Sequence, residues 1–287
     1  MKIKLSAFSD EAGADLREQI AALQRNGIMM TELRSVDNKN VGELTEAEAK
    51  ATENVLREEG ISLSAIGSPI GKVPISTDID KYLDTVKHVC ELACILGTDR
   101  IRMFSFFESH GERGRVIDNL NRMVSTAEKY GVGLYHENEK GIYGDTLERV
   151  LDLKNNVEGL HFVYDPANFL QVGEDPDLTI PALVPISDYF HVKDVISDGA
   201  ILVPAGEGDG QIPRIVSMID RDTIMTLEPH LMIFDGYDKI DGEKMKHKFS
   251  YESNFAAFDA AANALKAILI NNGFKETKQE NEGFVKC

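Results

Sequence analysis

Short apolar runs alternate with longer amphipathic runs along nearly the whole chain. Eight of the apolar runs have the length of a strand, and eight amphipathic runs follow the helical period. The expected strands are residues 3–8, 28–34, 61–67, 100–105, 132–137, 160–165, 188–193 and 224–228, and the expected helices are residues 14–25, 45–59, 80–96, 115–130, 146–153, 178–184, 212–219 and 251–271. Such alternation joins parallel strands through crossover helices, and eight units need about 250 residues, so the pattern predicts a single (β/α)8 TIM barrel of the α/β class.

Cap residues support the boundaries of this pattern. Thr45 and Glu48 have the spacing of a capping box at the start of the second helix, and Gly97 directly follows the third helix. The competing architecture is a doubly wound open sheet, but no Gly-x-Gly-x-x-Gly motif follows the first strand and no phosphate-binding loop is present. We therefore expect one catalytic barrel domain over residues 1–274 and a polar, frayed tail over residues 275–287.

The charge of the chain limits its partners. The 287 residues include 31 basic and 48 acidic ones, so the formal net charge is −17. Such a charge disfavours nucleic acid and anionic membranes as partners, because phosphate groups bind to basic faces. The N-terminus lacks the apolar stretch of a signal peptide, no run approaches the roughly 18 apolar residues of a membrane span, and the cysteines are too few for a disulfide framework. We expect a reduced, cytoplasmic protein.

Four consecutive predicted strands end in residues that can bind a metal ion. Strands five to eight end in Glu137, Asp165, His191 and Glu228, in that order. Active-site groups of a (β/α)8 barrel lie at the carboxyl ends of its strands, so closure should bring these four side chains around one mouth. Three carboxylates placed together repel one another unless a cation joins them. Oxygen-rich ligands with a single nitrogen favour one Mn²⁺ or Mg²⁺ ion, with Zn²⁺ or Co²⁺ as alternatives.

Each of these residues also has a simpler explanation. Acidic residues often follow strands because they cap the next helix, and an acidic chain carries many on its surface. The two-residue period of a strand gives a sharper expectation, since Lys193 shares a face with His191 and should look into the same mouth. Glu139 shares a face with Glu137 and is the rival ligand, but Glu137 directly ends the apolar run. We therefore expect Glu137 to be the ligand.

Five stretches between the second and eighth predicted strands carry a family resemblance. They are GIMMTELR at residues 27–34, Glu137-Asn138, YDPANF at residues 164–169, HVKD at residues 191–194 and LEP at residues 227–229. In these stretches the sequence resembles the xylose isomerase-like family of (β/α)8 barrels. That family contains sugar isomerases, ketose 3-epimerases, inosose dehydratases and endonuclease IV enzymes. The resemblance covers nearly the whole barrel.

The resemblance implies roles for individual residues. The implied metal ligands are Glu137, Asp165, His191 and Glu228. It places Glu32 near the site, and we expect Glu32 and Arg34 to bind distant substrate hydroxyls. Asn168 stands where ketose 3-epimerases often carry a histidine, and we place it among the substrate-binding residues.

The expected reaction is metal-dependent proton transfer next to the carbonyl group of a sugar, or of a related polyol or keto acid. The ion would stabilise the enediolate that forms when the carbon loses its proton. Glu137 and Glu228 would act as base and acid, and Lys193 would hold a substrate hydroxyl or carboxylate or shuttle a proton. The chain would then be an isomerase or epimerase with a small carbohydrate substrate.

Three alternatives to this function exist. A dehydratase acting on a keto-cyclitol or keto-sugar would use the same site and expel a hydroxyl group. A barrel that binds a sugar or a metal ion without turnover would belong to another class. A nuclease of the endonuclease IV kind needs further histidines at strand ends, but the third strand ends in Ser68-Pro69. Barrels of this type often form homo-oligomers, although the sequence carries no interface signature.

Overall fold

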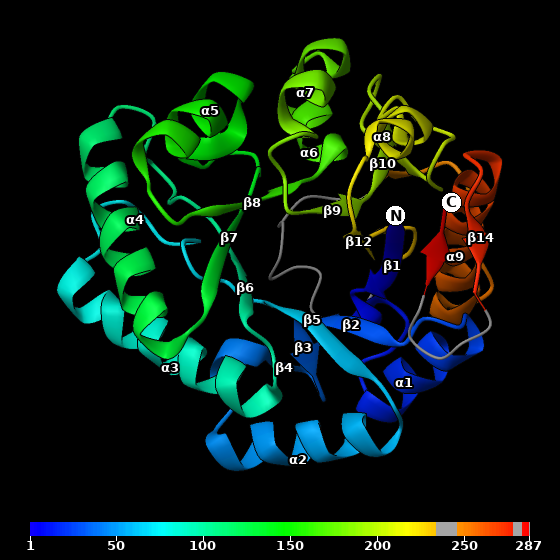
Figure 1. The fold of residues 1–287 in the computed structure, drawn as a ribbon, viewed down its shortest axis with the longest axis horizontal. Helices are drawn as coiled ribbons and strands as arrows, with labels where there is room; N and C mark the ends of the chain where they lie inside the picture. Colours follow the sequence, from blue (N-terminus) through cyan, green and yellow to red (C-terminus); the bar gives the residue numbers. More distant parts are fainter. Residues whose placement is uncertain (234–245, 278–282, 287) are drawn as a thin grey trace.

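The computed structural model describes residues 1–233, 246–277 and 283–286. Eight parallel strands form a curled inner sheet that is surrounded by helices (Figure 1). The eight strands are β1 (Lys2–Ala7), β2 (Met30–Leu33), β5 (Ser62–Gly67), β6 (Arg100–Met103), β7 (Gly133–Glu137), β8 (His161–Tyr164), β9 (Tyr189–Val192) and β12 (Thr223–Leu227). Each of them overlaps a strand expected from the sequence.

The helices follow the strands in the expected alternation. In the described part of the chain they are α1 (Leu16–Arg25), α2 (Glu46–Glu58), α3 (Ile79–Leu96), α4 (Arg113–Ala127), α5 (Leu147–Asn156), α6 (Pro166–Gln171), α7 (Pro176–Leu183), α8 (Ile212–Met218) and α9 (Asn254–Asn271), with short 3-10 helices η1 (Ser9–Glu11), η2 (Val41–Glu43), η3 (Glu128–Tyr130) and η4 (Tyr143–Asp145). The predicted capping box is confirmed, because the side chains of Thr45 and Glu48 each accept a hydrogen bond from the other residue's backbone. Gly97 ends α3 in the left-handed conformation, with φ of +76°.

The sheet is curled, but its backbone hydrogen bonding is open between β1 and β2. Pairing runs in the order β1–β12–β9–β8–β7–β6–β5–β2, and each neighbouring pair is parallel. Side chains bridge the remaining seam, since Thr31 Oγ1 donates to the carbonyl oxygen of Ala7 at 3.0 Å and lies 2.9 Å from Ser9 Oγ. The expected closed eight-stranded barrel is therefore not confirmed, although the order and direction of the strands agree with it.

The C-terminal segment joins the sheet. Its strands β14 (Lys275–Glu276) and β15 (Phe284–Val285) pair with each other in antiparallel fashion, and β15 also pairs antiparallel with β1. The aromatic ring of Phe284 is 1% exposed, so burial of this side chain attaches the segment to the barrel. This differs from the frayed tail that the polar sequence predicts. Residues 278–282 and 287 of that tail lie outside the described residues.

Two small sheets follow the carboxyl ends of barrel strands. One pairs β3 (Ser35–Val36) with β4 (Lys39–Asn40), and the other joins β10 (Asp194–Ile196), β11 (Ile201–Val203) and β13 (Lys246–His247). The carboxylate of Asp194 accepts hydrogen bonds from the backbone amides of Gly206, Gly208 and Gly210 at 2.8, 3.1 and 2.9 Å. The glycine-rich loop after β11 is thus wrapped around one buried carboxylate that directly follows Lys193.

An apolar layer lies inside the barrel beneath the strand ends. Tyr135, Val163, Tyr189 and Ile224 form a buried cluster of their own. These residues precede the polar strand-end residues by two or four positions, so they share the same inward face. They form an apolar floor beneath a polar centre. Among the helices of the described ranges, none combines the length and apolar character needed to cross a membrane.

Candidate metal centre and active site

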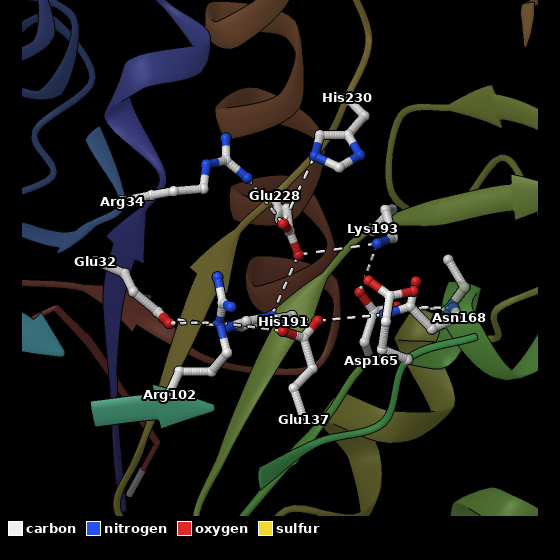
Figure 2. Close-up of polar contacts among 12 residues, drawn as sticks. Glu32, Arg34, Arg102, Glu137, Asp165, Asn168, His191, Lys193, Glu228 and His230 are labelled. Atoms are coloured by element: carbon white, nitrogen blue, oxygen red, sulfur yellow. Dashed lines mark hydrogen bonds and ion pairs between the residues drawn. The ribbon is translucent and has the colours of Figure 1, made fainter. Parts of the chain in front are cut away.

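Four side chains from neighbouring strands converge at the carboxyl end of the barrel. Glu137 is the last residue of β7, Asp165 directly follows β8, His191 lies in β9 and Glu228 directly follows β12. Each offers one ligand atom, and these four atoms lie within 4.8 Å of one another. All four residues are buried, and Figure 2 shows their side chains meeting in one region. The structure thus brings together the set expected from the strand ends.

Glu32 contacts the imidazole of His191 on the side away from the other ligand residues. Nε2 of His191 lies 3.1 Å from Oε2 of Glu32, whose Oε1 accepts a hydrogen bond from the hydroxyl of Tyr189 at 3.0 Å. Its Nδ1 lies 3.0 Å from Oε1 of Glu137 and 3.2 Å from Oε2 of Glu228. A carboxylate behind a histidine fixes the orientation and tautomer of a metal-binding imidazole. Nδ1 is consequently the nitrogen that faces the centre.

The two oxygens of Asp165 have different partners. Oδ1 accepts hydrogen bonds from the backbone amides of Ala167 and Asn168 at 2.8 and 3.1 Å and so caps helix α6, which begins with Pro166. Oδ2 lies 3.0 Å from Nζ of Lys193. Oδ1 therefore caps a helix, and Oδ2 is the oxygen that is left to face the candidate metal centre. The D-P-A-N sequence serves this cap, which explains why the segment after β8 is helical although the sequence predicts a loop there.

Three of the converging atoms are buried without a hydrogen-bond partner of suitable geometry. They are Oδ2 of Asp165, Nδ1 of His191 and Oε2 of Glu228. Buried polar atoms are nearly always hydrogen-bonded, so atoms that are not need another explanation, such as an ion. When His191 is unprotonated, all three are electron-pair donors directed into one small space. This observation fits a metal ion held by these residues.

Burial and neighbouring charges shift the pKa values of the converging groups. Burial alone would lower the pKa of His191, but the carboxylates of Glu137 and Glu32 raise it well above its ordinary value. Burial alone would raise the pKa of Glu228, but Lys193 and His191 hold it well below its ordinary value. Burial raises the pKa of Asp165 to about 7, although Lys193 acts in the opposite direction. Before an ion binds, a proton on His191 thus offsets part of the negative charge.

Buried carboxyl groups outnumber buried cations around the centre. The buried carboxyl groups are Asp10, Glu11, Glu32, Glu137, Asp165 and Glu228, and the buried cations are Arg34, Arg102 and Lys193. Burial raises the pKa of Glu11 to about 8, so this group is mainly protonated at neutral pH. The other carboxyl groups still outnumber the three cations, so the cluster can accommodate added positive charge.

A cavity of about 60 Å³ opens beside these ligands. Arg34, Asn168 and Lys193 line it, together with the ligand residues Glu137 and Glu228. Lys193 therefore looks into the mouth, as its strand parity predicts. Asn168 is also bound to the centre, since its Nδ2 donates to Oε1 of Glu137 at 3.2 Å.

Glu32 and Arg34, which are expected to bind substrate hydroxyls, contact other protein side chains. Glu32 is fully buried and contacts His191 and Tyr189. Arg34 lines the cavity but also donates to Glu228 and Asp10. Both residues therefore contact the candidate ligands or their supports directly.

Arg102 and Lys72 are not among the residues expected from the sequence, and Glu139, expected only as a rival ligand, forms an ion pair with Lys72. Arg102 Nε lies 3.2 Å from Oε2 of Glu137, and Lys72 Nζ lies 3.2 Å from Oε2 of Glu139 at the cavity wall. The sequence itself indicates a special role for Arg102, because a charged residue in the middle of the apolar run of β6 is unusual for a buried parallel strand. Lys72 lies in the loop after β5, where no periodic pattern indicates which way a side chain points.

Comparison with known proteins defines the class. Residues 20–248 match the sequence profile of a family described as xylose isomerase-like TIM barrel, and the chain belongs to this family. No curated protein sequence matches it. The fold is thus that of the xylose isomerase-like TIM barrel family.

Solved structures share this fold at low sequence identity. A probable 3-DHS dehydratase, AsbF from Bacillus anthracis, is 18% identical, with a TM-score of 0.70 over 93% of this chain and 99% of the other. A D-allulose 3-epimerase from Methylomonas sp. is 14% identical, with a TM-score of 0.72 over 93% and 98%. A xylose isomerase-like TIM barrel protein from Mycobacterium smegmatis, in complex with magnesium, is 14% identical, with a TM-score of 0.68 over 93% and 96%.

Proposed function

We propose that this protein catalyses divalent-metal-dependent proton transfer at a carbon atom next to a carbonyl group. Its substrate would be a small sugar, or a related polyol or keto acid, and the reaction an isomerisation or epimerisation. The convergence of one ligand atom each from Glu137, Asp165, His191 and Glu228 within 4.8 Å carries this proposal. The similarity in fold to an epimerase and to a magnesium-containing barrel supports it.

The residues have separate tasks in this proposal. A divalent ion bound to the four ligands would act as a Lewis acid toward the substrate carbonyl and the hydroxyl next to it. Glu137 and Glu228 approach from β7 and β12, on either side of β9, and would exchange the carbon-bound proton as base and acid. Asn168 would orient Glu137 through their hydrogen bond of 3.2 Å. Lys193 would hold a substrate oxygen at the cavity wall.

Replacement of one proposed base tests this function. Glu228→Gln should lower turnover about 10²–10⁴-fold, the usual contribution of a general acid or base, because the amide cannot accept the proton. Turnover and the exchange of substrate hydrogen in D₂O would be measured with Mn²⁺-loaded protein on a panel of ketoses and aldoses. Glu148→Gln, on the exposed face of α5, is the matched control and should behave like the wild type. Normal activity of Glu228→Gln on a substrate that the wild type converts would refute the proposal.

A dehydratase reaction is the second candidate. Asn168 replaces the histidine of many epimerases, and the Lys193 ammonium lies beside the cavity, where it could protonate a departing hydroxyl group. The fold similarity to a probable dehydratase agrees with this candidate. The mass of the product separates the two reactions, because loss of water lowers the mass and isomerisation leaves it unchanged.

A further inference from the structure

Two buried arginines, Arg34 and Arg102, lie against the two glutamates of the candidate metal centre. Arg34 directly follows β2, and Arg102 lies within β6, which pairs with the ligand strand β7. Their side chains are 5% exposed. A buried guanidinium group is costly unless it is paired, so its partners indicate why it is present.

Arg34 connects the carboxylate of Asp10 to one oxygen of Glu228. Its Nε and Nη2 each donate to a different oxygen of Asp10 at 2.9 Å, and its Nη1 donates to Oε1 of Glu228 at 3.0 Å. The carboxylate of Asp10 is itself held, because Ser35 Oγ donates to its Oδ2 at 2.7 Å. The forked contact with Asp10 fixes the plane of the guanidinium group and therefore the direction of Nη1.

Arg102 faces Glu137 through an ion-pair contact, since its buried Nε has no hydrogen-bond partner among the described residues. Its Nε lies 3.2 Å from Oε2 of Glu137 and 3.7 Å from Oε1 of Glu32. Its Nη1 donates to the backbone carbonyl of Ser68 at 2.9 Å, which ties the group to the end of β5. Arg102 is thus anchored to one strand while it faces a glutamate on another.

The ring of Phe8 supports both arginines. The guanidinium carbon of Arg34 lies 4.4 Å from the ring centroid and that of Arg102 lies 5.4 Å from it. The imidazole of His191 meets the same ring edge to face, at 5.2 Å between centroids. Gly67 lies beside this group, where an added Cβ would come within 2.6 Å of the Phe8 ring and 3.2 Å of Nη2 of Arg102. Close packing therefore leaves the two arginines little freedom to move.

Each arginine engages one oxygen of a glutamate and leaves the other oxygen facing the centre. For Glu228 the outer oxygen is Oε1, and the inner oxygen, Oε2, lies 3.2 Å from Nδ1 of His191. For Glu137 the outer oxygen is Oε2, and the inner oxygen, Oε1, lies 3.0 Å from the same nitrogen. Figure 2 shows both arginines next to these carboxylates.

We propose that Arg34 and Arg102 are positioning residues that hold Glu228 and Glu137 as single-oxygen ligands and thereby set the affinity and coordination number of the bound ion. This inference rests on the metal centre of the proposed function but not on the reaction. It assigns Arg34 to the orientation of a ligand in place of substrate binding. Arg34 needs the forked geometry, because lysine keeps the charge but cannot contact Asp10 and Glu228 in one plane. Arg102 needs the planar group to reach both Glu137 and the backbone carbonyl of Ser68.

Arginine-to-lysine variants test this inference. Mn²⁺ affinity would be measured by calorimetry on metal-free protein, and the visible spectrum would be recorded with saturating Co²⁺, whose absorption depends on coordination number. Arg34→Lys and Arg102→Lys should each weaken Mn²⁺ binding about ten- to a hundredfold, as is usual when a partner of a metal ligand is replaced. The Co²⁺ spectrum should also change, because the released oxygen of the glutamate becomes free to bind the ion.

Arg113→Lys is the matched control. Arg113 forks onto Asp152 with contacts of 2.8 and 2.6 Å, but it lies on the surface, with a side chain 55% exposed. It should keep the affinity and the spectrum of the wild type.

If both site variants fold and bind Mn²⁺ within twofold of the wild type with an unchanged Co²⁺ spectrum, the inference is wrong. A purely structural role would lower thermal stability but leave the spectrum of the saturated centre unchanged, which would also overturn it. Failure of the wild type to bind any divalent ion would instead contradict the proposed function.

Discussion

At the scale of single residues, the carboxylates of the site are divided between two kinds of partner. Oδ1 of Asp165 caps α6 while Oδ2 faces the centre, and Oε1 of Glu228 meets Arg34 while Oε2 faces the centre. This division leaves one oxygen of each carboxylate directed toward the other ligand atoms, where a cation can contact them together.

Glu11 provides a prediction of pH-dependent stability. Burial raises its pKa to about 8 in the folded protein, from an ordinary value of 4.5. Folding therefore favours the protonated form, and this contribution to the free energy of unfolding is fully present below the ordinary value and is lost as the pH rises through about 8. In metal-free protein, the free energy of unfolding of Glu11→Gln, measured relative to that of the wild type, should rise by about 2–4 kcal/mol from about pH 5 to about pH 8.5.

Urea denaturation of the two proteins at both pH values measures this difference. Glutamine can still accept the hydrogen bond of 2.8 Å that the backbone amide of His230 donates to Oε2, so the variant should fold. A difference in the free energy of unfolding that stays constant over this pH range would show that Glu11 does not titrate in the folded protein as described.

Strand parity predicts part of the site, but the network around it depends on the curvature of the sheet. The order Glu137, Asp165, His191 and Glu228 and the inward direction of Lys193 follow from apolar runs and a period of two. The contact between Arg34 and Glu228 joins residues 194 positions apart across the barrel mouth. No local pattern encodes that contact, because it depends on the radius of the ring and on which rotamers fill it.

At the scale of secondary structure elements, the C-terminal strand β15 protects the edge of the sheet beside β1. Phe284 is paired with Ile3 and is 1% exposed. A pairing of two residues within a polar tail has too few positions to show any periodicity, so the sequence predicts only a loose end there. The same limit applies to α6, which is six residues long and begins at a proline.

Truncation of the Phe284 side chain tests this role of the tail. Phe284→Ala should lower the free energy of unfolding by about 3–5 kcal/mol, because it removes a buried aromatic ring and leaves a cavity. Phe249→Ala is the matched control, since Phe249 is 39% exposed and should cost only about 0.5 kcal/mol. Equal effects of the two changes in chemical denaturation would contradict the view that the tail is part of the fold.

At the scale of the whole molecule, an acidic protein gathers buried acidic and basic side chains at one end of its barrel. The net charge of −17 is distributed over the chain, whereas the buried cluster contains six carboxyl groups and three cations. The apolar floor of Tyr135, Val163, Tyr189 and Ile224 separates this cluster from the opposite end of the barrel. Binding of one divalent ion is the event that this arrangement favours.

Anomalous X-ray diffraction from crystals grown with Mn²⁺ tests this central claim most directly. We predict one strong peak per chain in the barrel mouth, about 2.0–2.4 Å from one donor atom each of Glu137, Asp165, His191 and Glu228. A mouth without a peak at saturating Mn²⁺, or an ion bound only by other groups, would contradict the account.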